Sequence, residues 1–183
     1  MIRRSRNGRL PAAALCDLWH APYQDRADAV ASLFALNDAY RAAFGRDMCL
    51  SSGYRDLEEQ AALPARKGGL AAAPGTSNHG WGPAVDLCPS TYSEEAETWL
   101  HEVGPVYGWA NPSWAHRGGD GPYEPWHWEY TDAVTEIEAR TGRRWCGGRP
   151  AASGTIRLPM VAVLAVVLGR LNEPSWKDSP VFT

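Results

Sequence analysis

The sequence predicts a small α+β domain, and two observations carry that prediction. Nine Trp, 18 Gly and 14 Pro among 183 residues are typical of aromatic surfaces joined by many turns, not of a helical bundle. Stretches with helical periodicity also alternate along the chain with short stretches that have strand character. Setting aside a C-terminal stretch of different composition leaves roughly 145 residues, the usual size of one domain. We therefore expect one domain followed by a tail.

Four segments are predicted as helices. Asp25 to Phe44 carries apolar residues at intervals of three and four, and Gly45 stands at the C-cap position. Ser93 to Val103 is a second amphipathic segment, and Thr131 to Arg140 is a candidate for the final helix. Asp56, followed three residues later by a glutamate, resembles a capping box that opens a short helix.

Short strands are predicted between these helices, from β-forming residues bounded by turn residues. The predicted strands are Met48 to Ser52, Pro83 to Leu87, Tyr107 to Ala110 and Trp126 to Tyr130. Pro64 to Asn78 is rich in Gly, Ala and Pro without an apolar period, which predicts a long loop of the kind that borders active sites. After Cys146 the composition becomes that of a linker. The predicted division is a catalytic domain at 1–146 and a linker with a C-terminal tail at 147–183.

Charge and hydropathy exclude several classes of partner. Lys and Arg total 18 against 21 Asp and Glu, so no strong positive field is present to hold a nucleic acid. The longest apolar run, Leu158 to Leu168, is about half of the ~20 residues that cross a bilayer, so we expect no membrane span. Met1 to Arg6 is basic, but polar residues follow instead of an apolar stretch, and no signal peptide is predicted.

The four cysteines are too scattered for a zinc ribbon; they are Cys16, Cys49, Cys88 and Cys146. An even count permits two disulfides in three possible pairings, and buried free thiols are the alternative. Cys88 follows Asp86 by two residues and shares its strand face, which makes a fourth metal ligand geometrically conceivable. We reject that role because a catalytic zinc must keep one position open for water.

Histidine and carboxylate are the usual ligands of a catalytic zinc ion, which needs about three of them. Of the five histidines, three are better explained as surface or structural residues: His20, His101 and His116. His79 and His127 differ because each lies at a junction of loop and strand beside carboxylates and aromatic residues. They are the candidate metal ligands.

Asp86 lies in a strand predicted to be buried, where an isolated carboxylate is costly unless a metal or a cation pairs with it. Capping of the strand end, or pairing with an arginine, is an equal alternative on spacing alone. Glu124 stands three residues before His127, and in a regular strand the two side chains would face opposite ways. Both can reach one metal only if a bend or bulge intervenes. A carboxylate beside the metal can take a proton from the attacking water; without a metal, Glu124 would be a surface acid.

Three separated motifs, in order, resemble a known family. Ser77 to Asp86 resembles the SxHxxGxAxD signature, and Glu124 to His127 the ExWH signature, of the D-alanyl-D-alanine carboxypeptidase (VanY-like) family. Ser51 to Arg55, with Gln60 shortly after, resembles the SGYR…Q segment of that family. The family belongs to the wider group that contains lysostaphin and hedgehog-type zinc folds. The resemblance covers roughly residues 8 to 131, without departure at any motif position.

The resemblance implies a small antiparallel sheet with flanking helices and one catalytic Zn²⁺ in a cleft on the sheet. It also implies roles: His79, Asp86 and His127 bind the zinc, Glu124 is the general acid and base, and Arg55 lies over the substrate. A guanidinium there suits either a terminal carboxylate or the oxyanion of the tetrahedral intermediate.

Three further residues are expected at the substrate. Ser77 and Gln60 would hydrogen-bond its backbone, and Trp126 would form a wall of the cleft, with Trp81 as a second candidate. Buried packing is the alternative for both tryptophans. We expect the chain to work as a monomer.

The function implied is zinc-dependent hydrolysis of a peptide bond in peptidoglycan stem peptides, first of all as a D-alanyl-D-alanine carboxypeptidase. An L-alanyl-D-glutamate endopeptidase of the phage endolysin kind, and a non-catalytic hedgehog-like zinc module, are the alternatives. Such an enzyme would act at the bacterial cell wall, after release at lysis or through an export signal missing from this sequence.

Overall fold

A computed structural model of the chain describes residues 5–63 and 72–141. The predicted linker and tail at 147–183 lie outside these residues, and so does Cys146. Most of the predicted loop between Pro64 and Asn78 also falls outside them. Within the described residues, no helix is both long enough and apolar enough to cross a bilayer.

A short antiparallel hairpin, β1 (Leu15–Asp17) with β2 (Gln24–Arg26), precedes the long helix α1 (Ala27–Phe44). The hairpin was not predicted, and the helix prediction was wrong in its first two residues because they pair in β2. The C-terminus of α1 is as predicted: Gly45 has φ 68°, and its N–H donates to the Arg41 carbonyl at 2.8 Å. Glycine adopts this left-handed conformation without a steric penalty.

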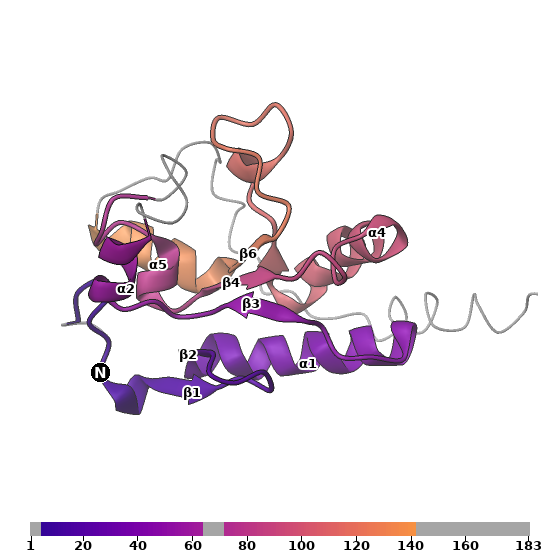
Figure 1. Cartoon of the computed structure of the whole chain (residues 1–183), viewed down its shortest axis with the longest axis horizontal. Helices are drawn as coiled ribbons and strands as arrows, with labels where there is room; N and C mark the ends of the chain where they lie inside the picture. The colour runs from indigo at the N-terminus through magenta and orange to yellow at the C-terminus, as the bar shows by residue number, and fades with distance from the viewer. Residues whose placement is uncertain (1–4, 64–71, 142–183) are drawn as a thin grey trace, which may run out of the picture. The chain divides into compact units, whose positions relative to one another are not determined.

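Four strands form an antiparallel sheet in the order β3-β4-β6-β5, of which Figure 1 labels β3, β4 and β6. They are β3 (Leu50–Ser52), β4 (Ala84–Leu87), β5 (Trp109–Ala110) and β6 (His127–Tyr130). On the two central strands, Asp86 of β4 lies directly opposite His127 of β6. The register therefore brings together two predicted ligands that are 41 residues apart in sequence.

The described residues include three more helices: α2 (Leu57–Ala62), α4 (Glu94–Val103) and α5 (Thr131–Thr141). The predicted capping box opens α2, where Asp56 accepts from the Glu59 N–H and the Glu59 side chain accepts from the Asp56 N–H. Short 3-10 turns complete the described elements: η2 (Ala12–Ala14), η4 (Asn78–Trp81), η5 (Gly104–Tyr107) and η6 (Ser113–Ala115). All four strand predictions began too early, by two residues for β3 and β5 and by one residue for β4 and β6. For example, Tyr107 ends η5 and Trp126 lies in the turn before β6.

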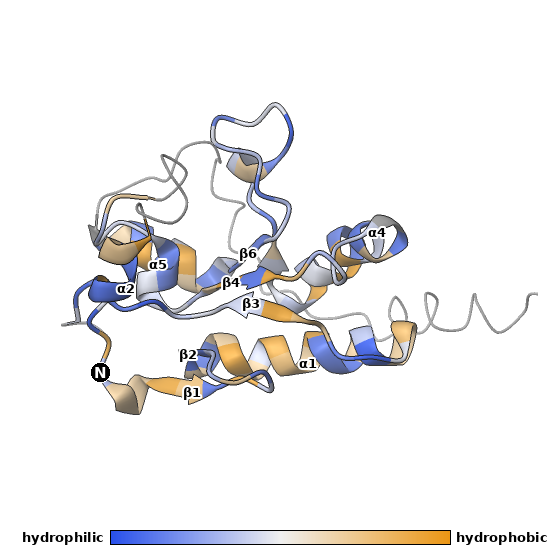
Figure 2. Ribbon diagram, in the orientation of Figure 1, coloured by the Kyte–Doolittle hydropathy of each residue, from blue (hydrophilic) through white to orange (hydrophobic). Residues whose placement is uncertain are grey.

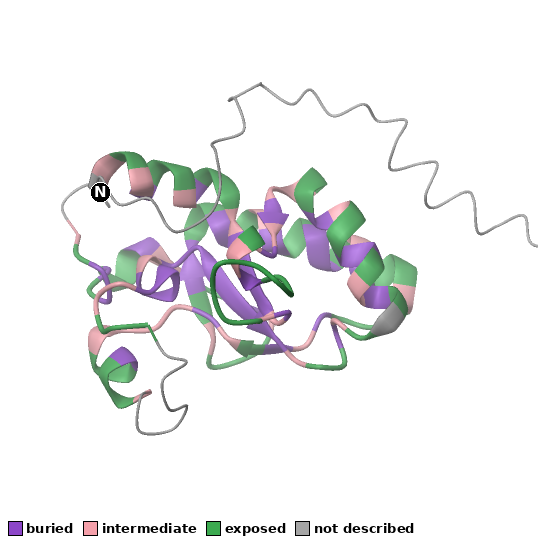
Figure 3. Cartoon of the chain, turned by 90° about the horizontal axis from the view of Figure 1, so that it is seen from above, coloured by how far each residue is buried: buried purple, intermediate pink, exposed green. Residues whose placement is uncertain are grey.

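One face of the sheet packs against α1 and forms the hydrophobic core. Alternate residues of the central strands, such as Val85 and Trp128, join Leu33, Leu36 and Tyr40 of α1 there. Figure 3 shows the strands buried at the centre. Figure 2 shows hydrophobic residues along α1 and hydrophilic colours in the loop between η6 and β6. Because side chains alternate across a strand, the intervening residues of β4 and β6 point to the opposite face.

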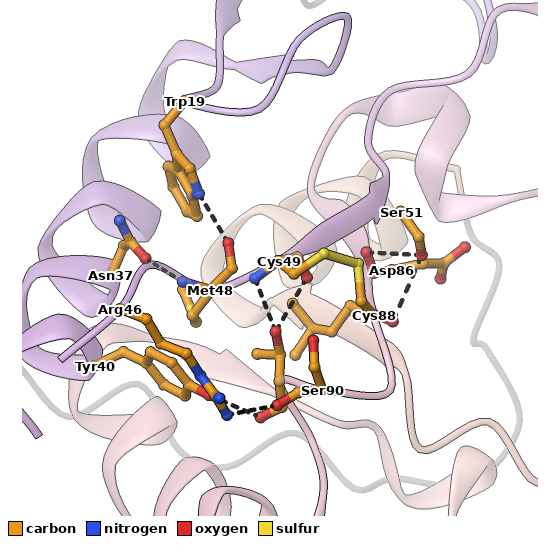
Figure 4. The surroundings of a disulfide bond; sticks show 12 residues. Trp19, Asn37, Tyr40, Arg46, Met48, Cys49, Ser51, Asp86, Cys88 and Ser90 are labelled. Carbon is orange, nitrogen blue, oxygen red and sulfur yellow. Dashed lines mark hydrogen bonds between the residues drawn. A yellow bond between two sulfur atoms is a disulfide. The ribbon is translucent and has the colours of Figure 1, made fainter. Parts of the chain in front are cut away.

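A disulfide joins Cys49, just before β3, to Cys88, just after β4, with Cα atoms 5.3 Å apart (Figure 4). The Cys49 N–H donates to Oγ1 of Thr91, and Oγ of Ser51 donates to the Asp86 carbonyl beside the bridge. Cys16 is a free and exposed thiol, so the alternative of buried free thiols is wrong for the described cysteines. The rejection of Cys88 as a metal ligand is confirmed, since its sulfur is in the disulfide.

Candidate metal centre

Three buried side chains converge on the face of the sheet opposite the core. His79 comes from η4, Asp86 from β4 and His127 from β6. Oδ1 of Asp86 lies 3.2 Å from Nε2 of His79 and 3.3 Å from Nδ1 of His127, and the two ring nitrogens are 3.2 Å apart. Among the described residues, this is the group of His, Cys, Asp and Glu side chains close enough to hold a metal ion.

The triangle has the size that zinc requires. Bonds of about 2.0 to 2.1 Å in a tetrahedron place neighbouring ligand atoms roughly 3.3 to 3.4 Å apart. The three observed separations lie within about 0.2 Å of that spacing. Two imidazoles and one carboxylate are also a donor set that leaves a fourth position for water or substrate. The residues present therefore fit a catalytic zinc ion.

The His79 ring is oriented by a hydrogen bond at Nδ1, the ring nitrogen that is not part of the triangle. Its Nδ1 lies 2.8 Å from the carbonyl oxygen of Gly53, so an N–H at that position donates to the carbonyl and leaves Nε2 for the metal. The turn that carries His79 closes at Gly82, with φ 76°, and its N–H donates to the His79 carbonyl at 3.2 Å. A side chain at Gly80 would collide with Asn7, because its Cβ would lie 2.0 Å from Oδ1. Gly80 and Gly82 thus allow the close backbone packing that orients the His79 ring.

His127 is held by a carboxylate that the sequence analysis missed. Its Nε2 lies 2.8 Å from Oε1 of Glu129, which also accepts a 2.9 Å hydrogen bond from the amide of Asn78. All three side chains are buried. Such a carboxylate–histidine pair fixes the ring and makes it a stronger ligand. The available signal was the period of two in a strand, which puts Glu129 on the same face as His127.

Burial and charge set the protonation of these groups. Burial lowers the pKa of His79 to about 4, although Asp86 opposes this effect. Burial would lower the pKa of His127 too, but hydrogen bonds to the carboxylates of Asp86 and Glu129 outweigh it and raise the pKa to about 10. Burial also acts to raise the pKa of Asp86, yet the two imidazoles hold it well below its ordinary value. A cation that enters the triangle would therefore displace a proton from His127.

A tight turn precedes His127, where the sequence analysis required a bend. The His127 N–H donates to the Glu124 carbonyl at 3.1 Å, which closes a tight turn through Pro125 and Trp126. The required bend is therefore present, since β6 begins only at His127, and the approach of the Glu124 carboxylate to the metal triangle stays a prediction. Glu124 is half-buried at the start of the turn.

Arg55 is a half-buried cation near carboxylates of the site. It follows β3, and its backbone N–H donates to the His79 carbonyl at 3.2 Å. Burial lowers the pKa of Arg55, whereas the nearby negative charges of Asp86, Glu124 and Glu59 act to raise it. Its buried Nε has no hydrogen-bond partner within residues 5–63 and 72–141. A buried donor without a partner is suited to an acceptor on a ligand.

Gln60 and Ser77 are both buried beneath the site. The amide of Gln60 donates to Oδ1 of Asn7 and to the Arg55 carbonyl, both at 3.0 Å, and its oxygen accepts from the Gly75 N–H at 2.9 Å. The Ser77 carbonyl accepts a 2.7 Å hydrogen bond from Asn7. These contacts hold the frame of the site, and substrate hydrogen bonds by either side chain stay a prediction.

Trp114 adds to the aromatic residues predicted near the site, and a cleft wall formed by Trp126 or Trp81 stays a prediction. Trp126 is half-buried in the turn, and its carbonyl accepts from the Leu87 N–H at 2.8 Å. Trp81 lies under the guanidinium of Arg140, 5.1 Å from its ring centre. Trp114 of η6, which the sequence analysis did not single out, has its ring 5.2 Å from that of His127. No periodic pattern in the sequence links Trp114 to the site, because the contact depends on how its loop folds back.

The other three histidines lie outside the triangle, as predicted. They are His20, His101 and His116, and all three are exposed. The sequence reasoning that set them aside is confirmed for the metal group of the described residues.

Comparison with known proteins decides which family this site represents. A family model described as VanY, D-alanyl-D-alanine carboxypeptidase, matches residues 23–133, which include every residue of the triangle as well as Arg55 and Glu124. The chain belongs to this family. Members of the VanY family hydrolyse peptides with zinc, and this VanY-family chain is a zinc-dependent peptidase.

Solved structures share the fold of this VanY-family chain. The vancomycin-resistance D,D-pentapeptidase VanY of the VanB-type cassette, solved with Zn(II), is 26% identical with a TM-score of 0.54, covering 71% of this chain and 88% of that chain. The LD-carboxypeptidase LdcB is 22% identical with a TM-score of 0.54, covering 72% and 75%. The D,D-dipeptidase VanXYg is 21% identical with a TM-score of 0.54, covering 75% and 63%. No curated protein sequence matches the chain.

Proposed function

We propose that this peptidase is a D-alanyl-D-alanine carboxypeptidase that removes the terminal D-alanine from peptidoglycan stem peptides. His79, Asp86 and His127 hold the zinc, Glu124 is the general acid and base, and Arg55 binds the terminal carboxylate. The family description and the similarity to a zinc-bound D,D-pentapeptidase support the substrate class. The geometry of the triangle supports the ligand set.

The position of Arg55 carries the choice of a carboxypeptidase. The negative charges of Asp86 in the metal triangle and of Glu124, the proposed base, both act on its guanidinium, and its buried Nε is available to a ligand. A planar guanidinium binds a carboxylate through two parallel hydrogen bonds with a fixed charge. A substrate whose C-terminal carboxylate meets Arg55 would place its last peptide bond beside the triangle.

The chain's own groups then supply proton transfer. A bound zinc ion provides a Lewis acid for the scissile carbonyl and for the attacking water. The Glu124 carboxylate accepts a proton from that water as the water oxygen bonds to the carbonyl carbon. It then delivers the proton to the leaving nitrogen as the C–N bond breaks. Glu124 is half-buried, so its side chain is partly accessible to a substrate.

The direct test is digestion of purified peptidoglycan and of a synthetic stem pentapeptide, with identification of the released ends by mass spectrometry. We expect free D-alanine from the wild-type protein and none from Glu124→Gln. Removal of a general acid and base lowers the rate typically by about 10² to 10⁴-fold. Glu102→Gln, an exposed carboxylate on α4, is the matched control and should keep full activity. Zinc content should be equal in all three proteins.

Other products would replace this proposal with one of its alternatives. New ends after L-alanine, without free D-alanine, would identify an L-alanyl-D-glutamate endopeptidase. Zinc binding without cleavage of either substrate would identify a non-catalytic zinc module. Absence of zinc from protein purified without chelator would contradict all three.

A second test separates the two possible partners of Arg55. Wild type and Arg55→Ala are each assayed on a peptide ending in D-Ala-D-Ala and on the same peptide with an amidated C-terminus. If Arg55 binds the terminal carboxylate, amidation should strongly lower kcat/KM for wild type and change it little for Arg55→Ala. If Arg55 instead stabilises the oxyanion, the variant should lose the same factor on both peptides.

The site of action follows from this substrate. Peptidoglycan lies outside the membrane, so we propose that the enzyme works at the bacterial cell wall. Whether it reaches the wall by export or by release at lysis, as a phage endolysin does, stays a prediction from the sequence.

A further inference from the structure

We propose that Asn111 is a positioning residue for Glu124, acting as an amide clamp on the turn that precedes β6. This inference rests on the proposed function, because it concerns the residue assigned there as general acid and base. Asn111 reaches the site through two backbone carbonyls, one of which belongs to the metal ligand His127.

The clamp lies just past the point where the backbone pairing of β5 with β6 ends. β5 ends at Ala110, which pairs with Glu129, so the next residue stands beside the beginning of β6. Residue 112 is a proline, which has no N–H to offer to a neighbouring strand. The side chain of Asn111 takes over at this point, since its amide carries two N–H donors.

Both of these donors are used on the turn. Nδ2 of Asn111 lies 3.0 Å from the Glu124 carbonyl oxygen and 2.6 Å from the His127 carbonyl oxygen. The two carbonyls belong to the first and last residues of the turn, so one amide joins its ends. Asn111 is 7% exposed, and water therefore cannot easily replace the hydrogen bonds that it makes.

The surrounding contacts show what depends on the clamp. The Glu124 N–H donates to the Ala115 carbonyl at 2.9 Å, and the Trp126 carbonyl accepts from Leu87. The Glu124 carbonyl accepts from the N–H of His127 and from the Asn111 amide. Of these two bonds, the one from Asn111 comes from outside the turn, so its loss would remove a tie between the turn and the end of β5.

His127 is less dependent on Asn111 than Glu124 is. Its backbone pairs with Asp86 in the sheet, and its ring is held by Glu129. Asn111 is fixed in turn by the ring of His116, whose Nε2 lies 3.1 Å from the Asn111 carbonyl. Removal of the clamp should therefore displace the base and leave the zinc ligands in place.

The test compares Asn111→Ala and Asn111→Asp with wild type. The Asp variant keeps the volume but replaces the donor by an oxygen, so it remains informative if the Ala variant does not fold. Asn37→Ala is the matched control, because Asn37 is also buried and bonds through its amide, to Asp47 and the Met48 N–H. Each protein is measured for zinc content, for kcat and KM on the stem pentapeptide, and for amide hydrogen exchange.

For both Asn111 variants we expect kcat to fall about 10- to 100-fold, because small misplacement of a catalytic group has effects of this size. KM and zinc content should stay within about threefold of wild type, and the His127 N–H should exchange faster. Asn37→Ala should lower the unfolding temperature while kcat stays unchanged. In wild-type protein, the two Nδ2 protons of Asn111 should give separate, slowly exchanging NMR signals, a readout that needs no variant.

Three results would overturn the clamp. They are an unchanged kcat in folded Asn111 variants, loss of zinc in proportion to activity, and fast exchange of the Asn111 amide protons in wild type. If wild-type protein has no peptidase activity, the proposed function fails, and the exchange measurements still decide whether the clamp exists.

Discussion

Alternate residues of strands β4 and β6 form the two faces of the central sheet, yet the two faces follow different physical rules. The inner face, with Val85, Leu87 and Trp128, packs against α1. The outer face, with Asp86 and His127, is as deeply buried but consists of ionisable groups within hydrogen-bond distance of one another. Apolar burial is non-directional and depends on volume, whereas buried polar groups depend on the geometry of their partners.

This difference predicts which property a substitution on each face should change. On the inner face a truncation leaves a cavity and lowers the free energy of unfolding. On the outer face the groups hold each other in place at an electrostatic cost, so a change should appear in metal binding and catalysis first. Four predictions test this separation.

The largest effect is expected from Asp86→Ala. The substitution removes the group that both imidazoles contact, so zinc should be lost. Without zinc the transition state loses several kcal/mol of stabilisation, which should lower kcat/KM by roughly 10³-fold or more. Metal analysis and the pentapeptide assay provide the measurement. Asp132→Ala, an exposed residue of α5, is the control and should match wild type. An Asp86→Ala protein that keeps stoichiometric zinc would contradict the ligand assignment.

Trp128→Ala is the counterpart on the inner face. Removing this buried ring should lower the free energy of unfolding by about 3 to 5 kcal/mol, measured by urea denaturation. The fraction that remains folded should still bind one zinc ion. Tyr123→Ala, an exposed aromatic, should change stability by less than about 0.5 kcal/mol. If the Trp128 variant is stable but has no zinc, the two faces are not separable as described.

Glu129→Ala should have an intermediate effect on the outer face. Loss of the carboxylate that holds the His127 ring should weaken zinc binding by about 10- to 100-fold in a competition titration. Glu129→Gln keeps an acceptor oxygen without the charge and should lose less. Equal affinities for the Ala variant and wild type would show that His127 needs no such support.

The smallest effect concerns Asp25, a fully buried carboxyl outside the triangle whose oxygens have no hydrogen-bond partner among the described residues. Burial raises the pKa of Asp25 well above its ordinary value of 3.8, with nearby Arg26 opposing. The unfolded chain therefore loses this proton at a lower pH than the folded protein does. As a result, the carboxyl lowers the free energy of unfolding as pH rises from about 4 through the folded pKa of Asp25.

Asp25→Asn should remove that penalty. Urea unfolding should show the variant to be more stable than wild type near pH 8 and similar to it near pH 4. An equal difference at both pH values would mean that the effect comes from packing and not from ionisation. Asp86, buried to a similar degree but paired with two imidazoles, has its pKa shifted the opposite way.

The sequence predicted the elements that carry strong local signals. α1 has a long apolar period and a glycine cap, and α2 has a capping box, so local hydrogen bonding determines both. The hairpin of β1 and β2 was missed because strands of three residues are too short to show a period, and their pairing is decided by tertiary contacts.

The motifs likewise located the metal triangle and Glu124, but not the residues that support them. Glu129, Asn111 and Trp114 act through contacts that depend on strand register and on how a loop folds back. Such contacts join distant parts of the chain and leave little trace in spacing. The pairing of Cys49 with Cys88 was undetermined for the same reason, since it follows from the antiparallel pairing of β3 and β4.

The disulfide has a consequence for how damage to this enzyme would be seen. Cys49 and Cys88 close a covalent ring that contains His79 and Asp86, while His127 lies outside it. A single break of the backbone anywhere inside the ring would leave both pieces attached through sulfur. The broken molecule would migrate as one chain on a denaturing gel without reductant and as two fragments once a thiol is added.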